Sequence, residues 1–213
     1  MRNYKKVVAT TLCVSLLMGT TVFASENVVV EKNQDKEMVM QNLENKIRER
    51  KTESYILIKD EKTGEESRIE LGEIETNIRN CGDYIEATEE VDIEESLKNT
   101  PSIATNQNTV NTISGWKGTV KITYTDDGQY ACLKSTTGGW TKVSGSYNMT
   151  NKRVTYGQNL GTNSKNGTTT FGTSFSVNTG FAKGKYGSGH FLGANIAGQI
   201  NGKTVSVVCN HYL

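Results

Sequence analysis

The sequence of 213 residues has little of the apolar material that a membrane protein needs. Its one sustained apolar run, from Val7 to about Met18, is shorter than the roughly 20 residues that a membrane-spanning helix requires. Three basic residues precede the run and small residues follow it, which is the pattern of a secretory signal. We therefore predict a signal peptide over residues 1–24 with cleavage after Ala24, and a secreted, extracellular protein.

Acid–base and metal-binding side chains are scarce in the second half of the chain. Between residues 107 and 213 the only carboxylates are Asp126 and Asp127, which are adjacent in a predicted turn. A glycosidase needs two opposed acids, so this half lacks the residues for that chemistry. The few cysteines and histidines show no short paired spacing of zinc ligands. We therefore expect no metal site and no cofactor.

One pair of residues at the end of the chain nevertheless invites a catalytic interpretation. Cys209 and His211 lie two positions apart, and His190 is the other histidine. A nucleophilic cysteine needs a thiolate, a nearby imidazole and usually a third group that orients the imidazole. However, no cysteine-protease signature surrounds Cys209, and any two residues at this spacing share one face of a strand. A small Cys-dependent enzyme is therefore the lesser alternative.

The cysteines that follow the predicted signal are odd in number: Cys81, Cys132 and Cys209. In an exported protein, disulfides form and persist. We predict a Cys132–Cys209 disulfide that fastens an early strand of the second half to the last strand. Cys81 then remains alone in the first half.

Charge divides the chain into two halves behind a net charge of only +1. Residues 25–106 carry 21 acidic and 11 basic side chains, whereas residues 107–213 carry 2 acidic and 10 basic side chains. The first half shows a helix pattern that includes Met38, Leu43 and Ile47, then two alternating segments around the turn EKTGEE.

We therefore predict an acidic αββ region at 25–87, which is a candidate propeptide. Residues 88–112 are acidic and then polar, contain the only proline and show no sustained apolar period. This composition predicts a linker.

Strand patterns fill residues 113–213, the basic domain. The segment GTVKITYT places Val120, Ile122 and Tyr124 on one face, and the following DDGQ is a hairpin turn. Asn201-Gly202 predicts a second hairpin, which joins the last two strands. About seven short strands with Gly-rich and Asn-rich turns predict an antiparallel β-sandwich or small barrel. The fold class is thus mainly β, with the acidic αββ region in front.

Aromatic residues lie between the positive charges of the basic domain, among them Trp116, Trp140 and Tyr147. A cationic surface of this kind attracts anionic cell-envelope polymers or membrane surfaces. Nucleic acid would suit the charge, but not an extracellular compartment, so we do not expect it as a partner. The predicted surface-binding residues are Lys117, Lys121, Lys142, Lys152, Arg153, Lys183, Lys185, Trp116 and Trp140.

A different membrane activity is suggested by the Ser/Thr-rich segment TTTFGTSFSV, which alternates Phe171, Thr173, Phe175 and Val177 with small residues. The segment SGHFLGANIAG is similar in length. Alternating segments of about 9–11 residues can form the membrane-spanning hairpin of a pore-forming toxin. Two ordinary sandwich strands are the alternative, which we prefer.

Several short motifs from Trp116 onward, namely W-K-G-T, Y-T, G-G-W and N-K-R-V-T-Y-G-Q, resemble a group of uncharacterised secreted domains from Gram-positive bacteria. The resemblance covers about 108–213. It implies a β-rich extracellular fold and carries over no catalytic residues.

The layout of a signal, an acidic segment and a basic domain is similar to that of precursors of cationic antimicrobial proteins. There, an acidic segment masks a cationic domain electrostatically until a processing protease cuts between them. The layout therefore implies a non-enzymatic, bacteriocin-like β domain whose partner before cleavage is its own acidic region. In the alternative, both halves stay joined as a surface-binding or inhibitory protein.

Overall fold

The computed structural model describes residues 34–93 and 115–213, so the predicted signal peptide lies outside the described residues. The chain divides into two compact units, 1–42 and 43–213, and every described strand belongs to the second. A helix spans 34–49. Leu43 and Ile47, one turn apart, are buried, whereas Met38 is 60% exposed. Met38 does not share their face, because a spacing of five residues turns it well away from Leu43.

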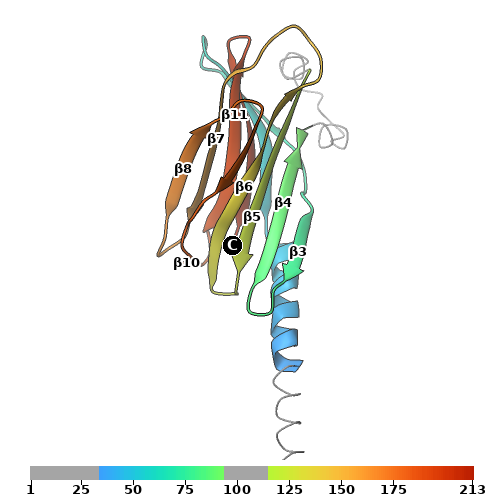
Figure 1. The fold of residues 1–213 in the computed structure, drawn as a ribbon, viewed down its shortest axis with the longest axis vertical. Coiled ribbons are helices and arrows are strands. Elements are labelled where there is room, and N and C mark those ends of the chain that lie inside the picture. The colour runs from blue at the N-terminus through green and yellow to red at the C-terminus, as the bar shows by residue number, and fades with distance from the viewer. Residues whose placement is uncertain (1–33, 94–114) are drawn as a thin grey trace, which may run out of the picture. The chain divides into compact units, whose positions relative to one another are not determined.

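Two antiparallel sheets account for the strands of the described residues (Figure 1). Sheet A has the order β2 (Glu66–Glu70), β1 (Thr52–Asp60), β12 (Lys203–Tyr212), β11 (Phe191–Ile200), β7 (Thr150–Asn159) and β8 (Lys165–Thr170). Sheet B has the order β10 (Gly184–Lys185), β6 (Tyr130–Lys142), β5 (Trp116–Asp126), β4 (Ile85–Asp92) and β3 (Thr76–Asn80), with β9 (Ser174–Asn178) also paired to β6.

The two sheets pack face to face, with β11 and β12 of sheet A against β4, β5 and β6 of sheet B. The inner face of β5 contributes Val120, Ile122 and Tyr124, as its alternating pattern predicts, and β12 contributes Val205 and Val207. All five are fully buried, and each of the valine and isoleucine side chains stabilises the fold by about 1.5–3 kcal/mol. The prediction of a β-sandwich is confirmed, and the sheets do not close into a barrel.

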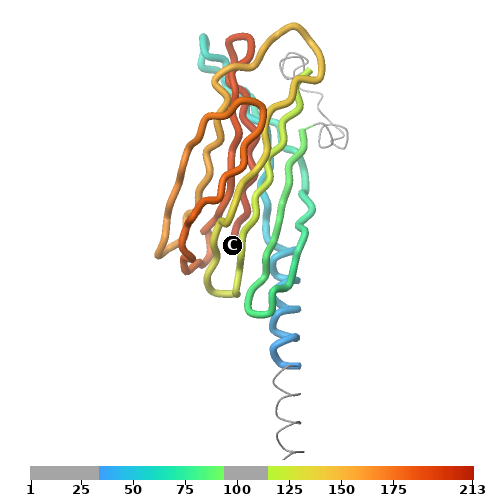
Figure 2. The backbone as a smooth tube through the Cα atoms, in the orientation of Figure 1, coloured from blue at the N-terminus to red at the C-terminus, as the bar shows by residue number. Residues whose placement is uncertain are grey.

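Strands of the acidic half belong to both sheets. β1 pairs with β12 along its whole length, from Thr52 opposite His211 to Asp60 opposite Lys203. β4 pairs with β5, and in Figure 2 the green tube of β3 and β4 runs beside the yellow-green tube of β5. The sequence predicted only two strands in this half, and β3 and β4 are additional. Residues 88–92 of the predicted linker lie in β4, and its residues from 94 onward lie outside the described residues.

The segment TTTFGTSFSV is not one continuous strand. Its first three residues end β8 at the edge of sheet A, and its last four lie in β9 of sheet B. The chain therefore crosses from one sheet to the other around Phe171, whose ring packs against that of Phe175 at a centroid distance of 4.9 Å.

Candidate functional site

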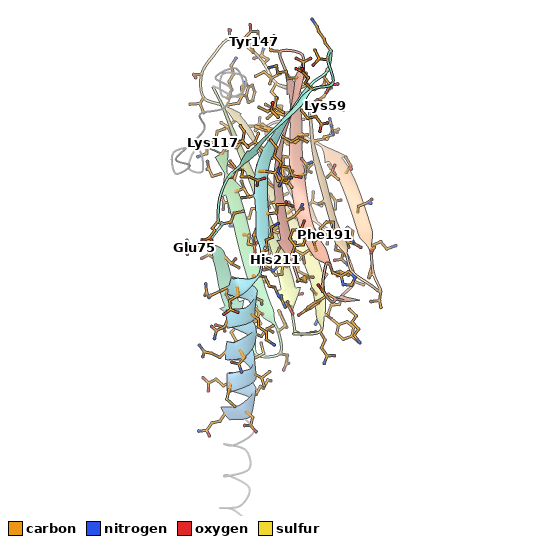
Figure 3. The ribbon with its side chains drawn as sticks, turned by 180° about the vertical axis from the view of Figure 1, so that it is seen from behind. Lys59, Glu75, Lys117, Tyr147, Phe191 and His211 are labelled. Atoms are coloured by element: carbon orange, nitrogen blue, oxygen red, sulfur yellow. The ribbon has the colours of Figure 1, made fainter. Side chains whose placement is uncertain are left out.

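Cys209 and His211, the pair at the end of the chain, lie on the inner face of β12 and are both fully buried. His211 Nδ1 is 2.6 Å from Oε1 of Glu89, which is itself fully buried on β4. The hydroxyl of Tyr124 lies 3.1 Å from His211 Nε2, and the two rings pack at a centroid distance of 4.6 Å. Figure 3 shows His211 from the side of sheet A.

Glu89 is the centre of this group, because it accepts hydrogen bonds from three hydroxyls. Thr52 Oγ1 donates to Oε2 at 3.1 Å, and both Thr76 Oγ1 and Tyr124 OH donate to Oε1 at 3.2 Å. Burial, and then the Glu89 charge, raise the pKa of Tyr124 well above its ordinary value, so the phenol stays protonated. We call Glu89, His211, Tyr124, Thr52 and Thr76 the Glu89 cluster. It joins β4 to strands of both sheets.

The environment of Cys209 opposes nucleophilic chemistry. Burial, and then the nearby Glu89 charge, raise the pKa of the Cys209 thiol well above its ordinary value. The reactive form of cysteine is the thiolate, which this site disfavours. His190, the other candidate, is half-buried, and its Nδ1 accepts a hydrogen bond of 2.7 Å from the backbone N–H of Gly187. The geometry therefore favours a structural role for the Cys209 and His211 pair.

The predicted Cys132–Cys209 disulfide is not formed, and within the described part of the chain Cys81, Cys132 and Cys209 are all free thiols. Cys132 lies on β6 next to Leu133, which is paired with the inward-facing Tyr124. Because side chains alternate along a strand, Cys132 points to the outer face of sheet B, where its thiol donates to the carbonyl of Phe181 at 3.0 Å. The backbone of sheet B therefore separates the Cys132 side chain from that of Cys209.

One buried ion pair was not predicted from the sequence. Asp126 was placed only in a turn, but its side chain is fully buried and forms an ion pair with Arg50, just after the helix. Tyr186 OH donates to Asp126 Oδ1 at 2.8 Å and accepts a hydrogen bond of 2.9 Å from Arg50 Nη2. Burial, followed by the Asp126 charge, raises the pKa of Tyr186 to about 12. We call these three residues the Arg50 clamp, which ties the acidic half to the basic half.

Two of the predicted surface-binding lysines pair with carboxylates of the acidic half. Lys117 Nζ is 2.8 Å from Asp92 Oδ2, and Lys121 Nζ is 3.5 Å from Glu90 Oε2. Exposed pairs of this kind stabilise a fold by only about 0–1 kcal/mol each. Their positive charges are nevertheless balanced locally by β4, and an anionic partner would have to compete with these carboxylates.

Three further residues of the predicted surface set lie on sheet B or beside it: Lys183, Lys185 and Trp140. Lys183 Nζ is 2.9 Å from Asp127 Oδ2, beside the turn between β5 and β6. Lys185 is exposed on β10. Trp140 is fully buried on the inner face of β6, so its prediction as a surface residue is wrong. Gly118 pairs with Trp140 on the neighbouring strand, and a Cβ atom there would lie 2.6 Å from the indole, so the glycine leaves room for this ring.

The structure does bring Trp116, Lys142 and Lys152 together, around the loop 143–149. Lys152 Nζ lies 5.2 Å from the centroid of the Trp116 ring. The indole N–H donates to the carbonyl of Tyr147 at 3.1 Å. Tyr147 is 58% exposed and Val143 is 66% exposed, and Figure 3 shows Tyr147 at the end of the sandwich away from His211. We define the loop patch as Trp116, Lys142, Val143, Tyr147 and Lys152. Arg153 follows Lys152 on β7, on the outer face of sheet A.

A groove of about 510 Å³ lies on the outer face of sheet A. Residues from β1, β12, β11, β7 and β8 line it, and Gly193 on β11 lies opposite Gly157 on β7 at its floor. The sequence patterns did not indicate this groove. We call it the sheet A groove.

No described helix is long and apolar enough to span a membrane. Within the same residues, no cluster of histidine, cysteine and carboxylate side chains has an arrangement that could hold a metal ion. The chain matches no protein-family model, and searches of curated proteins and of solved structures returned no match. The resemblance to secreted Gram-positive domains therefore stays a prediction.

Proposed function

We propose that the protein is an exported, non-enzymatic binding protein of the cell envelope, in which the two halves stay joined and the loop patch contacts an anionic envelope polymer. The observation that carries this proposal is the loop patch itself. Two lysines, one half-buried indole and two exposed apolar side chains gather there on one loop and the strand ends beside it.

The strand pairing supports joined halves over release of a basic fragment. Removing the acidic half would take β1 from β12 and β4 from β5, and would expose the hydrogen-bonding edges of both. It would also leave His211 without Glu89, and Asp126 without Arg50. Breaking a buried ion pair by removing one partner costs about 3–5 kcal/mol. The loss of the Arg50–Asp126 pair alone is a large share of the 5–15 kcal/mol that stabilises a whole domain.

The composition of the loop patch favours a polymer over a lipid bilayer. Val143 and Tyr147 are its two strongly exposed apolar side chains, which offer little area for insertion among acyl chains. The lysine ammonium groups instead attract phosphate or carboxylate groups over distances of about 8 Å at physiological salt. An aromatic side chain beside a cation can also pack against the backbone of a polymer chain.

Co-sedimentation with purified Gram-positive cell walls tests this proposal. The walls are used with their anionic polymers intact and after chemical removal of those polymers. We expect salt-sensitive binding to intact walls, and about tenfold weaker binding for the variant Lys142→Gln/Lys152→Gln/Tyr147→Ser, which corresponds to a loss of about 1.4 kcal/mol.

The matched control is Lys121→Gln/Lys183→Gln, which removes the same charge from two lysines that are already in ion pairs. We expect it to bind as the unchanged protein does. If both variants lose wall binding equally, the binding is nonspecific charge attraction and the assignment of the loop patch is wrong. Binding to anionic phospholipid vesicles, but not to intact walls, would favour a membrane partner and overturn the choice of a polymer.

A further inference from the structure

We infer that the sheet A groove is a second binding site and that its ligand is an uncharged carbohydrate chain. The inference goes beyond the loop patch, because the groove shares no residue with it. It combines three observations: a floor where two glycines face each other beside an asparagine amide, a high density of amide groups, and an aromatic ring at one end.

The floor depends on two glycines that lie side by side. In the register of sheet A, Gly193 is opposite Gly157 on one side and Asn210 on the other. A Cβ atom on Gly193 would lie 2.2 Å from Asn210 Oδ1 and 2.4 Å from the carbonyl oxygen of Cys209. A Cβ atom on Gly157 would lie 2.9 Å from the carbonyl oxygen of Lys165. Both positions therefore require glycine, because the neighbouring strands and the Asn210 amide already occupy the space that a Cβ atom would take.

The residues around this floor are mostly amides and hydroxyls. On one side of the glycine pair, Asn195 of β11 is opposite Thr155 of β7, and on the other side Phe191 is opposite Asn159. Asn210 borders the floor on β12. Asn166 of β8, opposite Gly157, brings the number of lining asparagines to four.

The amide of Asn195 is incompletely used inside the protein. Its Oδ1 has no hydrogen-bond partner among the described residues. An unpaired buried acceptor costs about 1–3 kcal/mol, so most such groups have a partner in the working form of a protein. This oxygen is shielded from solvent, so the Asn195 side chain, which lines the groove, would have to rotate to accept a hydrogen bond from a ligand hydroxyl.

Carbohydrate fits this surface better than the other ligand classes. Each side-chain amide can donate and accept hydrogen bonds, and so can each sugar hydroxyl, so the two kinds of group can pair in either direction. The exposed face of an aromatic ring such as Phe191 packs against the apolar C–H face of a sugar ring. Lys165, at the border of the groove, is the charged residue among its lining residues, so the groove offers little to a polyanion. A lipid would leave the amides unpaired, and an extended peptide pairs with the edge of a sheet instead of its middle.

The test uses the full chain without its predicted signal peptide, with short soluble oligomers of N-acetylglucosamine and of glucose as neutral probes. Binding is followed by amide chemical shifts in two-dimensional NMR spectra. We expect at least one neutral oligomer to shift the resonances of Gly193, Asn195 and Asn210. Asn195→Leu should weaken that binding about tenfold while the thermal unfolding temperature stays unchanged. Phe191→Ala should also weaken it about tenfold, and the same spectra check that the variant is folded, because Phe191 packs against Tyr212.

The matched control is Thr170→Ala, which lies on the same outer face of β8, four residues beyond Asn166 and outside the lining of the groove. It should leave the affinity within about twofold. The loop-patch variant should also keep its affinity for the oligomer, so failure of the proposed function and failure of this inference are separable. Absence of shifts with both neutral oligomers, or shifts confined to the loop patch, would overturn the inference.

Discussion

Replacing Glu89 by glutamine removes one negative charge from the interior of the sandwich and keeps the shape of the side chain. Glu89 is fully buried, lies 2.6 Å from His211 Nδ1 and accepts hydrogen bonds from Thr52, Thr76 and Tyr124. Leaving a buried hydrogen-bonding group without its partner costs about 1–3 kcal/mol. Glutamine keeps one acceptor oxygen and can still accept from some of the hydroxyls, so we expect a loss of about 3 kcal/mol, the cost of one such group.

Urea unfolding measures this loss directly. With a slope of about 1–3 kcal/mol/M, a loss of about 3 kcal/mol lowers the midpoint by at least about 1 M. The neighbouring residue gives the control. Glu90 is 49% exposed and lies 3.5 Å from Lys121, so Glu90→Gln should cost no more than about 1 kcal/mol. Equal, small shifts of the midpoint in both variants would refute the assignment of Glu89 as a buried link between the halves.

Two further predictions concern other titratable groups. Folding raises the pKa of Tyr186 from 10.0 to about 12, so the stability that its phenol contributes is complete below pH 10 and is lost as the pH rises to about 12. The urea midpoint of Tyr186→Phe should therefore fall less between pH 10 and pH 12 than that of the unchanged protein. An equal fall in both proteins would contradict the Arg50 clamp. In the native protein of residues 25–213, a thiol reagent should react readily with the half-exposed Cys81 alone. Cys132 and Cys209 should react only once the protein is unfolded, and they should need no reductant. If these two cysteines react only after reduction, the predicted Cys132–Cys209 disulfide is present after all.

Alternation and turn residues were sufficient to predict the core strands β5, β11 and β12. The inner faces of β5 and β12 follow from period two, and the hairpin between β11 and β12 follows from Asn201-Gly202, which both have positive φ angles of 47° and 73°. These signals are local, because each one depends on residues that are neighbours in sequence. A sandwich could therefore be predicted without knowledge of its strand order.

β4 could not be predicted from a local pattern because a charged residue occupies one of its inward positions. Ile85, Ala87 and Val91 alternate as in a buried strand, but Glu89 interrupts them and makes the segment resemble a solvated linker. The partner that permits Glu89 to be buried is His211 on the last strand. Only the pairing of distant strands shows that the acidic half is part of the sandwich.

The candidate sites depend on register for the same reason. Trp116, Lys142 and Lys152 could be chosen individually as cationic or aromatic surface residues, but the loop around Tyr147 brings them together. In the sheet A groove, Gly193 lies opposite Gly157 of β7, and the local sequence around Gly193 does not predict this pairing.

Cleavage of the chain between its halves is the most direct test of the central claim, that the protein binds the envelope as one joined structure. A protease recognition sequence is placed within residues 94–112, the purified protein is cut, and the product is followed by gel filtration and by co-sedimentation with cell walls. We predict that the two fragments elute together, separate only in denaturant, and bind walls as the uncut protein does. A basic fragment that elutes alone, remains folded and binds walls or kills bacteria without the acidic half would contradict the account and establish the propeptide alternative.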